Sequence, residues 1–135
     1  MPAYTRPVGV PPPGDLAGIH VLVVEDDDDA REILGSLLAY AGAFVSTART
    51  AEAALTIMGH VRADVVVCDV NLTDHDALWL LGEVRLQQPD PPPIIVVSAQ
   101  DYDDHDMRRA GFVTYLRKPI SHEALLNEIL RAIRR

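Results

Sequence analysis

Residues 20–26, His20-Val-Leu-Val-Val-Glu-Asp26, decide the fold: an apolar run that ends in two acids. Three later apolar runs have the same design, each followed by a polar or charged residue. They are residues 65–68 before Asp69, 94–97 before Ser98 and 112–117 before Lys118. Short runs of this kind are typical of strands buried on both faces of a parallel sheet. Because the carboxyl ends of parallel strands meet along one edge, we predict that these polar side chains converge on one crevice.

Short apolar runs alternate with segments of helical period along the chain, which predicts βα units. We expect strands at residues 20–24, 44–47, 65–68, 94–97 and 114–116. A parallel sheet built from such units carries helices on both faces. The fold class is therefore α/β, with a doubly wound, five-stranded parallel sheet.

Apolar residues at helical spacing mark the helices between these strands. The first stripe is opened by Asp28 as N-cap and the last by Ser121. The stripes consist of Ala30, Ile33, Leu34, Leu37, Leu38 and Ala41; Ala51, Ala54, Leu55 and Met58; Leu78, Leu81 and Val84 or Arg85; and Leu125, Ile129, Ala132 and Ile133. Residues 103–110 contain only Met107 and Ala110 as apolar anchors, so we expect a short, polar and relatively mobile fourth helix.

The size and composition of the chain limit the classes of protein to which it can belong. A length of 135 residues suits one domain, and a net charge of −8 argues against direct nucleic-acid binding. No apolar stretch is long enough to cross a bilayer, so we expect no membrane insertion and a cytoplasmic location. Residues 1–18 hold five of the ten prolines and predict a flexible tail or linker before a domain at 19–135. Cys68, within a run of valines, is expected to be a small buried residue.

The acidic run that begins at Glu25 predicts a cation site. Five carboxylates through Asp29 would repel one another in a confined crevice unless a cation or solvent compensated. Mg²⁺ prefers oxygen ligands and is commonly held by one or two carboxylates together with phosphate oxygens. Glu25 and Asp26 follow a buried strand and are the better candidates, with Asp69 as a further carboxylate. The remaining acids are expected to form a solvated helix start.

Asp69 is also a candidate nucleophile. A carboxylate beside a metal and a cation can attack phosphorus and form an aspartyl phosphate. Lys118 could bind the phosphoryl group as a point charge, and the hydroxyl of Ser98 could donate to one of its oxygens. Each residue alone has an ordinary structural explanation, as a cap, an ion pair or a surface group. Only their shared position at strand ends favours a role in phosphoryl transfer over these structural roles.

Four stretches in a fixed order carry a family resemblance: Val21-Leu-Val-Val-Glu-Asp-Asp, Asp64-Val-Val-Val-Cys-Asp-Val-Asn-Leu, Ile94-Ile-Val-Val-Ser-Ala and Gly111-Phe-Val-Thr-Tyr-Leu-Arg-Lys-Pro. With them, residues 19–135 resemble a response regulator receiver domain of two-component signalling, a flavodoxin-like (βα)5 fold. The resemblance implies Asp69 as phosphoacceptor, with Ser98 and Lys118 holding the phosphoryl group. It implies Mg²⁺ bound by Asp26, Asp69, Glu25 through water and the Asn71 backbone carbonyl. It also implies a cis peptide between Lys118 and Pro119.

The same resemblance implies a switch and partners. Tyr115 matches the family's switch aromatic, which moves inward when Ser98 is drawn to the phosphate and so changes the binding face of the fourth helix, fifth strand and fifth helix. The implied partners are a sensor histidine kinase or phosphotransfer protein and a downstream protein target. The domain would be a phosphoacceptor with self-catalysed phosphotransfer and dephosphorylation rather than an enzyme. The oligomeric state stays open.

Some positions depart from the family pattern. Thr73 and Ala77 stand where proline and glycine are common, and the spacing from Ser98 to Lys118 is shorter than usual by roughly half a helical turn. A standard dimer through the fourth helix therefore cannot be assumed. Two alternatives remain: a phosphorylation-independent interaction module, and a haloacid-dehalogenase-like phosphatase. The phosphatase is disfavoured because Asn71 stands where those enzymes need an aspartate as general acid and base.

Overall fold

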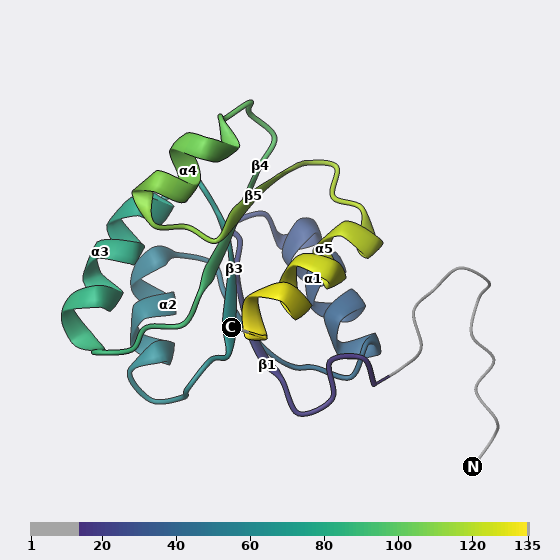
Figure 1. Ribbon diagram of the computed structural model, residues 1–135. Helices are drawn as coiled ribbons and strands as arrows, with labels where there is room; N and C mark the ends of the chain where they lie inside the picture. The colour runs from purple at the N-terminus through teal and green to yellow at the C-terminus, as the bar shows by residue number, and fades with distance from the viewer. Residues whose placement is uncertain (1–13, 135) are drawn as a thin grey trace, which may run out of the picture.

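The computed structural model describes residues 14–134, along which five strands alternate with five helices (Figure 1). The strands are β1 (His20–Val24), β2 (Phe44–Ala48), β3 (Val65–Asp69), β4 (Ile94–Ser98) and β5 (Thr114–Arg117). The helices are α1 (Asp28–Tyr40), α2 (Ala51–Met58), α3 (Ala77–Gln87), α4 (Asp104–Ala110) and α5 (His122–Ile133). Every predicted strand is present, and β3 and β4 include Asp69 and Ser98 as their last residues.

All five strands are parallel and lie in the order β2-β1-β3-β4-β5. The chain places β2 on one side of β1 and then crosses back to place β3 on the other side. This reversal creates the crevice at the strand ends where doubly wound folds bind ligands. Val24 pairs with Cys68, so Glu25 and Asp69 are the next residues on two neighbouring strands. The predicted α/β fold is confirmed.

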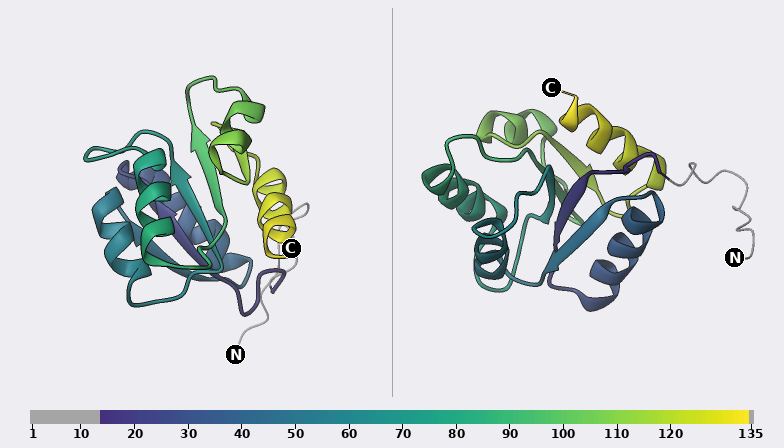
Figure 2. Two further views of the ribbon diagram at one scale, coloured as in Figure 1. Left: turned by 60° about the vertical axis from the view of Figure 1, so that its left-hand side comes forward. Right: turned by 90° about the horizontal axis from the view of Figure 1, so that it is seen from below.

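Helices cover both faces of the sheet, with α1 and α5 on one face and α2, α3 and α4 on the other (Figures 1 and 2). Alternate residues of β1 enter the two layers: Leu22 and Val24 pack on the α2 and α3 side, and Val21 and Val23 on the α1 and α5 side. All four are at most 1% exposed. Since burial of one such side chain contributes about 1.5–3 kcal/mol, the central strands are firmly held.

A side-chain cap fixes the start of every helix. In each case the side chain of the residue before the helix accepts a hydrogen bond from the backbone N–H three residues later, which satisfies an otherwise unpaired donor. The caps are Asp27, Thr50, Asp76, Asp103 and Ser121. The prediction of Ser121 is confirmed. The prediction of Asp28 as the cap of α1 is wrong by one residue, because Asp27 bonds the N–H of Ala30 and frees Asp28 to pair with Arg31.

Two predicted core residues are exposed. Ile33 is 64% exposed and Leu78 is 55% exposed. The cap at Asp76 sets the rotation of α3 so that the buried face follows the spacing of Ala77, Leu80, Leu81 and Val84. Leu78 then lies about 100° away from Ala77 around the helix and faces outward. Cys68 is fully buried, as predicted, and burial raises the pKa of its thiol.

The folded unit begins earlier than the sequence indicated. We predicted a tail over residues 1–18; residues 1–13 lie outside the described range, but Leu16 is fully buried in the layer between the sheet and helices α1 and α5. The backbone N–H groups of Gly14 and Leu16 both donate to the carbonyl of Ala41, at 3.0 and 2.9 Å. One apolar side chain among small and polar residues gives no periodicity, which is why the sequence did not reveal this anchor.

Helix α4 is short and polar, as predicted. It has seven residues, all of them described, and none is buried. It ends at Gly111, whose φ of +120° is a conformation that other residues rarely adopt. Met107 and Ala110 pack partly against the core, and Asp104 accepts hydrogen bonds from Thr114 and from the N–H of Tyr115 on β5.

Candidate functional site

The acids predicted from strand ends meet at the carboxyl edge of the sheet. Glu25 directly follows β1 and Asp69 ends β3, its neighbour. Each of Glu25, Asp26 and Asp69 offers a carboxylate oxygen within 4.8 Å of the others. Glu25 is 1% exposed and the side chain of Asp69 is 14% exposed. The crevice therefore holds three carboxylates close together, of which Glu25 is buried and Asp26 and Asp69 are partly buried.

This carboxylate cluster has the chemistry that a divalent cation requires. Burial, a hydrogen bond with Glu25 and the charge of Glu25 raise the pKa of Asp26 above its usual range. A hard cation would relieve that repulsion, and carboxylate oxygens are ligands that Mg²⁺ prefers. The three acids therefore fit the cation predicted from the sequence.

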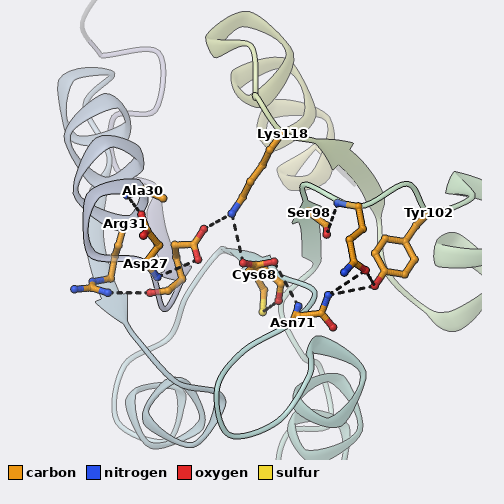
Figure 3. Close-up of polar contacts among 11 residues, drawn as sticks. Asp27, Ala30, Arg31, Cys68, Asn71, Ser98, Tyr102 and Lys118 are labelled. Carbon is orange, nitrogen blue, oxygen red and sulfur yellow. Dashed lines mark hydrogen bonds and ion pairs between the residues drawn. The ribbon is translucent and has the colours of Figure 1, made fainter.

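Lys118 supplies a positive charge to the same crevice. It lies one residue beyond β5 and reaches across the strand ends, as Figure 3 shows. Its Nζ donates a hydrogen bond to Oε1 of Glu25 and lies 3.4 Å from Oδ2 of Asp69. The peptide between Lys118 and Pro119 is cis, as the resemblance implied.

The surroundings of Lys118 keep it charged. Partial burial by itself would lower the pKa of the ammonium group, but the hydrogen bond to Glu25 and the charges of Asp69 and Glu25 outweigh that effect. The pKa of Lys118 is therefore raised above its usual range. An ammonium that is already positioned beside Asp69 can attract an anionic group arriving at that carboxylate.

Ser98 lies at the next strand end. Val97 pairs with Asp69 across the two strands, so Ser98 is one residue beyond the partner of Asp69. The hydroxyl of Ser98 accepts a hydrogen bond of 3.1 Å from the N–H of Gln100, and its carbonyl accepts one of 2.8 Å from the N–H of Lys118. Ser98 is 2% exposed. The two predicted phosphate-binding residues are thus joined through the backbone of β4 and β5.

Asn71 follows β3 by two residues and faces the loop between β4 and α4. Its N–H lies 3.4 Å from Oδ1 of Asp69, and its Nδ2 donates to the hydroxyl of Tyr102 at 3.3 Å (Figure 3). Tyr102 in turn donates to Oε1 of Gln100 at 2.9 Å. The side chain of Asn71 therefore connects the acidic crevice to the start of the α4 region.

Tyr115, the predicted switch aromatic, is half-buried on β5. Its hydroxyl donates to the carbonyl of Gln100, and its ring meets that of Tyr102 edge to face at a centroid distance of 5.9 Å. Its backbone N–H donates to Oδ1 of Asp104 at 3.0 Å. Tyr115 is thus held from the β4–α4 loop and from α4, the helix that the sequence predicts to be short and polar.

The sequence analysis missed several residues that shape this site. Arg31 donates to the carbonyl of Glu25 at 2.9 Å and so braces the end of β1. Both carboxylate oxygens of Asp74 accept N–H groups at the start of α2, which ties the loop after Asp69 to that helix. Gln100 joins Ser98 to Tyr115. Only Gln100 carried a sequence signal, since it lies two residues after Ser98 in the same loop.

The family of the chain follows from comparison with known proteins. The sequence model of the response regulator receiver domain matches residues 21–130. The chain belongs to the response regulator receiver domain family. The receiver domain is 35% identical over 108 residues to an uncharacterised 14.6 kDa protein of Leptolyngbya boryana, a match that covers 78% of this chain and 82% of that protein.

Two longer relatives are regulatory proteins by name. It is 34% identical over 112 residues to the response regulator protein FleR of Pseudomonas aeruginosa and 29% identical over 111 residues to the transcriptional regulatory protein GlrR of Escherichia coli. Each match covers 82% of this chain, but only 24% of FleR and 25% of GlrR. The receiver domain thus spans about a quarter of the length of these two relatives.

Solved structures agree in fold. The receiver domain of the Francisella response regulator 1452 superposes with a TM-score of 0.79 at 25% identity, covering 87% of this chain and 98% of that one. The chemotaxis response regulator CheY4 of Vibrio cholerae superposes with a TM-score of 0.76 at 28% identity, covering 84% and 98%. Among residues 14–134, no helix is long and apolar enough to span a membrane.

Proposed function

We propose that this receiver domain accepts a phosphoryl group on Asp69 from a phosphohistidine of a sensor histidine kinase or phosphotransfer protein, in a Mg²⁺-dependent reaction in the cytoplasm. One observation carries the proposal: Asp69 lies among three clustered carboxylates, with the ammonium of Lys118 3.4 Å from its Oδ2. This combination of a nucleophile, a cation-binding set and a fixed positive charge suits phosphoryl transfer.

The transfer replaces one bond to phosphorus by another. A carboxylate oxygen of Asp69 attacks the phosphorus of the phosphoimidazole, and an oxygen–phosphorus bond forms as the phosphorus–nitrogen bond breaks. The electron pair of the broken bond stays on the ring nitrogen, which takes a proton from solvent. The products are an aspartyl phosphate and a neutral histidine on the donor. The residues of this chain position and stabilise the group, so the domain is a phosphoacceptor whose own residues catalyse the transfer.

Different residues would hold the metal ion and the phosphoryl group. Glu25, Asp26, Asp69 and the backbone carbonyl of Asn71 would hold Mg²⁺, with Glu25 acting through water. When bound, the ion neutralises negative charge that develops on the phosphoryl oxygens. Lys118 attracts an oxygen of the phosphoryl group as a point charge. It would have to share or leave its hydrogen bond with Glu25 to do so.

Phosphorylation would change the surface formed by α4, β5 and α5. The phosphoryl group adds about −1.5 to −2 charges at Asp69, and the hydroxyl of Ser98 can turn toward it. Ser98 would then leave the N–H of Gln100, the residue whose carbonyl holds Tyr115. Tyr115 would move inward and present a different face to a downstream protein target.

Intact mass after incubation with acetyl phosphate tests this proposal, with and without Mg²⁺. Wild type is expected to gain one phosphoryl group only with Mg²⁺, and hydroxylamine should remove it. Asp69→Asn is expected to gain none. Asp90→Asn, which changes an acid before β4 at the other end of the sheet, is the matched control and should be labelled like wild type. A folded wild type that binds Mg²⁺ but is never labelled would instead favour the phosphorylation-independent module.

A further inference from the structure

The loop between β4 and α4 contains a second tyrosine beside the proposed switch. Tyr102 is half-buried, and its hydroxyl accepts a hydrogen bond from Nδ2 of Asn71 at 3.3 Å while donating one to Oε1 of Gln100 at 2.9 Å. A tyrosine hydroxyl has one proton, so accepting from one side and donating to the other satisfies both bonds. Figure 3 shows Asn71 and Tyr102 on the same side of the crevice as Ser98.

The ring of Tyr102 makes a separate contact with Tyr115. The two rings are 5.9 Å apart between centroids, with planes at 84°, which is the edge-to-face geometry that aromatic pairs prefer. Tyr115 also donates its hydroxyl to the backbone carbonyl of Gln100. Tyr102 thus contacts Tyr115 through its ring and contacts Asn71 and Gln100 through its hydroxyl.

We propose that Tyr102 is a positioning residue that couples Asn71, on the magnesium side of the crevice, to Tyr115, and that it holds Tyr115 in the conformation described here. The significance of this coupling for signalling rests on the proposed phosphorylation of Asp69. The positioning itself does not depend on phosphorylation and can be tested separately.

The short, polar character of α4 explains why such a residue is needed. None of the seven residues of α4 is fully buried, and only Met107 and Ala110 pack partly against the core, so the helix provides a small apolar anchor for the loop before it. Asn71 Nδ2 also reaches Oε1 of Gln100 directly, but at 3.5 Å, a longer contact than the 2.9 Å bond from the Tyr102 hydroxyl to the same oxygen. Tyr102 bonds both Asn71 and Gln100 through its hydroxyl and packs its ring against that of Tyr115, so it favours the described conformation of Tyr115.

Fluorine NMR of protein labelled with 3-fluorotyrosine tests the positioning without phosphate or metal. The chain has four tyrosines, and Tyr115→Phe identifies the Tyr115 signal. Asn71→Ala should shift the Tyr115 signal in an otherwise wild-type chain, and the shift should be at least twofold smaller when Tyr102→Phe is also present. Tyr102→Ala should move the Tyr115 signal by itself. Tyr40→Phe is the matched control at the end of α1 and should leave the Tyr115 signal and its response to Asn71→Ala unchanged.

A Tyr115 signal that responds equally to Asn71→Ala with and without the Tyr102 hydroxyl would overturn the coupling. An unchanged signal in folded Tyr102→Ala would overturn the positioning. If Tyr102→Ala does not fold, Tyr102→Phe still decides the coupling, because it keeps the ring and removes only the hydroxyl. These results do not depend on whether Asp69 can be phosphorylated.

A kinetic measurement then connects the coupling to the proposed function. Loss of one hydrogen bond that favours the described conformation should change the balance between the two conformations, so labelling of Tyr102→Phe by acetyl phosphate should differ in rate from that of wild type by about threefold to tenfold. Tyr40→Phe should match wild type. An unchanged rate in Tyr102→Phe would contradict a link between the coupling and phosphorylation. Absence of labelling in wild type itself would contradict the proposed function, while the NMR result would still decide the positioning.

Discussion

The two sides of the crevice are built in different ways. The acidic side is delivered by β1 and β3, whose residues are buried between two layers of helices. The proposed switch side depends on α4 and the loop before it, where polar contacts accompany apolar side chains that are only partly buried. Dense packing holds a buried strand and the carboxylate at its end in place, whereas a few hydrogen bonds can be exchanged at small cost. We therefore expect the acidic side to be the more rigid of the two.

A matched pair of truncations gives the largest contrast between the two sides. Leu22→Ala, in β1, should lower the free energy of unfolding by about 2–5 kcal/mol, because it leaves a cavity in the core. Met107→Ala, in α4, should lower it by less than about 1 kcal/mol, since Met107 is only partly buried. Urea denaturation of both variants provides the measurement. Equal losses would show that α4 is as firmly anchored as the central strands.

The Mg²⁺ affinity of the acidic side should depend on individual carboxylates. Glu25→Gln removes a buried carboxylate beside the proposed ion, so Mg²⁺ affinity should fall by about 10-fold to 100-fold, the usual effect of losing an outer ligand partner. Asp28→Asn, an exposed acid three residues away, is the control and should change affinity little. Calorimetric titration measures both, and the stacked pair of His75 and Trp79 offers a fluorescent reporter near the β3–α3 loop. A Glu25→Gln protein with unaltered affinity would remove Glu25 from the proposed ligand set.

The contact between α4 and β5 should depend on pH. Partial burial opposes ionisation of Asp104, but hydrogen bonds from Arg108 and from the N–H of Tyr115 outweigh it and lower the pKa of Asp104. An acid whose folded-state pKa is lowered stabilises the folded state above its ordinary pKa and loses that contribution as the pH falls through the folded-state pKa. Asp104→Asn should therefore cost about 1 kcal/mol or less at neutral pH, with the difference from wild type shrinking below about pH 4.

Urea midpoints at pH 7 and at acidic pH compare Asp104→Asn with wild type. A difference that stays constant across that range would mean that ionised Asp104 does not hold α4 to β5. The same measurement on the Tyr115 signal of fluorotyrosine-labelled protein would report whether the loss of Asp104 loosens the switch residue itself.

The smallest effect is expected at a surface ion pair on the same side. Arg117 lies 2.8 Å from Asp101, but the two side chains are 59% and 79% exposed. Exposed pairs contribute about 0–1 kcal/mol, so Arg117→Ala should change the free energy of unfolding by no more than about 0.5 kcal/mol. A loss comparable to that of Leu22→Ala would mean that this pair organises the β4–α4 loop.

Much of the fold and of the acidic side could be predicted from the sequence. Apolar runs define buried strands, and their last residues must lie at one edge of a parallel sheet, so Glu25, Asp69, Ser98 and Lys118 could be placed together without coordinates. The helical stripes were located well, although Ile33 and Leu78 were assigned to the wrong faces, because spacing does not fix the rotation of a helix. The early anchor at Leu16 was missed, because a single apolar residue has no period.

The positions of the strands along the chain, the identity of the clustered charges and the short, polar character of α4 follow from the sequence alone, because they depend on local composition and on the geometry of parallel sheets. Only the tertiary structure decided which partners these residues take: Lys118 with Glu25 as well as Asp69, Gln100 between Ser98 and Tyr115, and Tyr102 against Tyr115. Such contacts join residues from different loops. Their geometry follows from the packing of whole elements against one another, which local sequence does not specify.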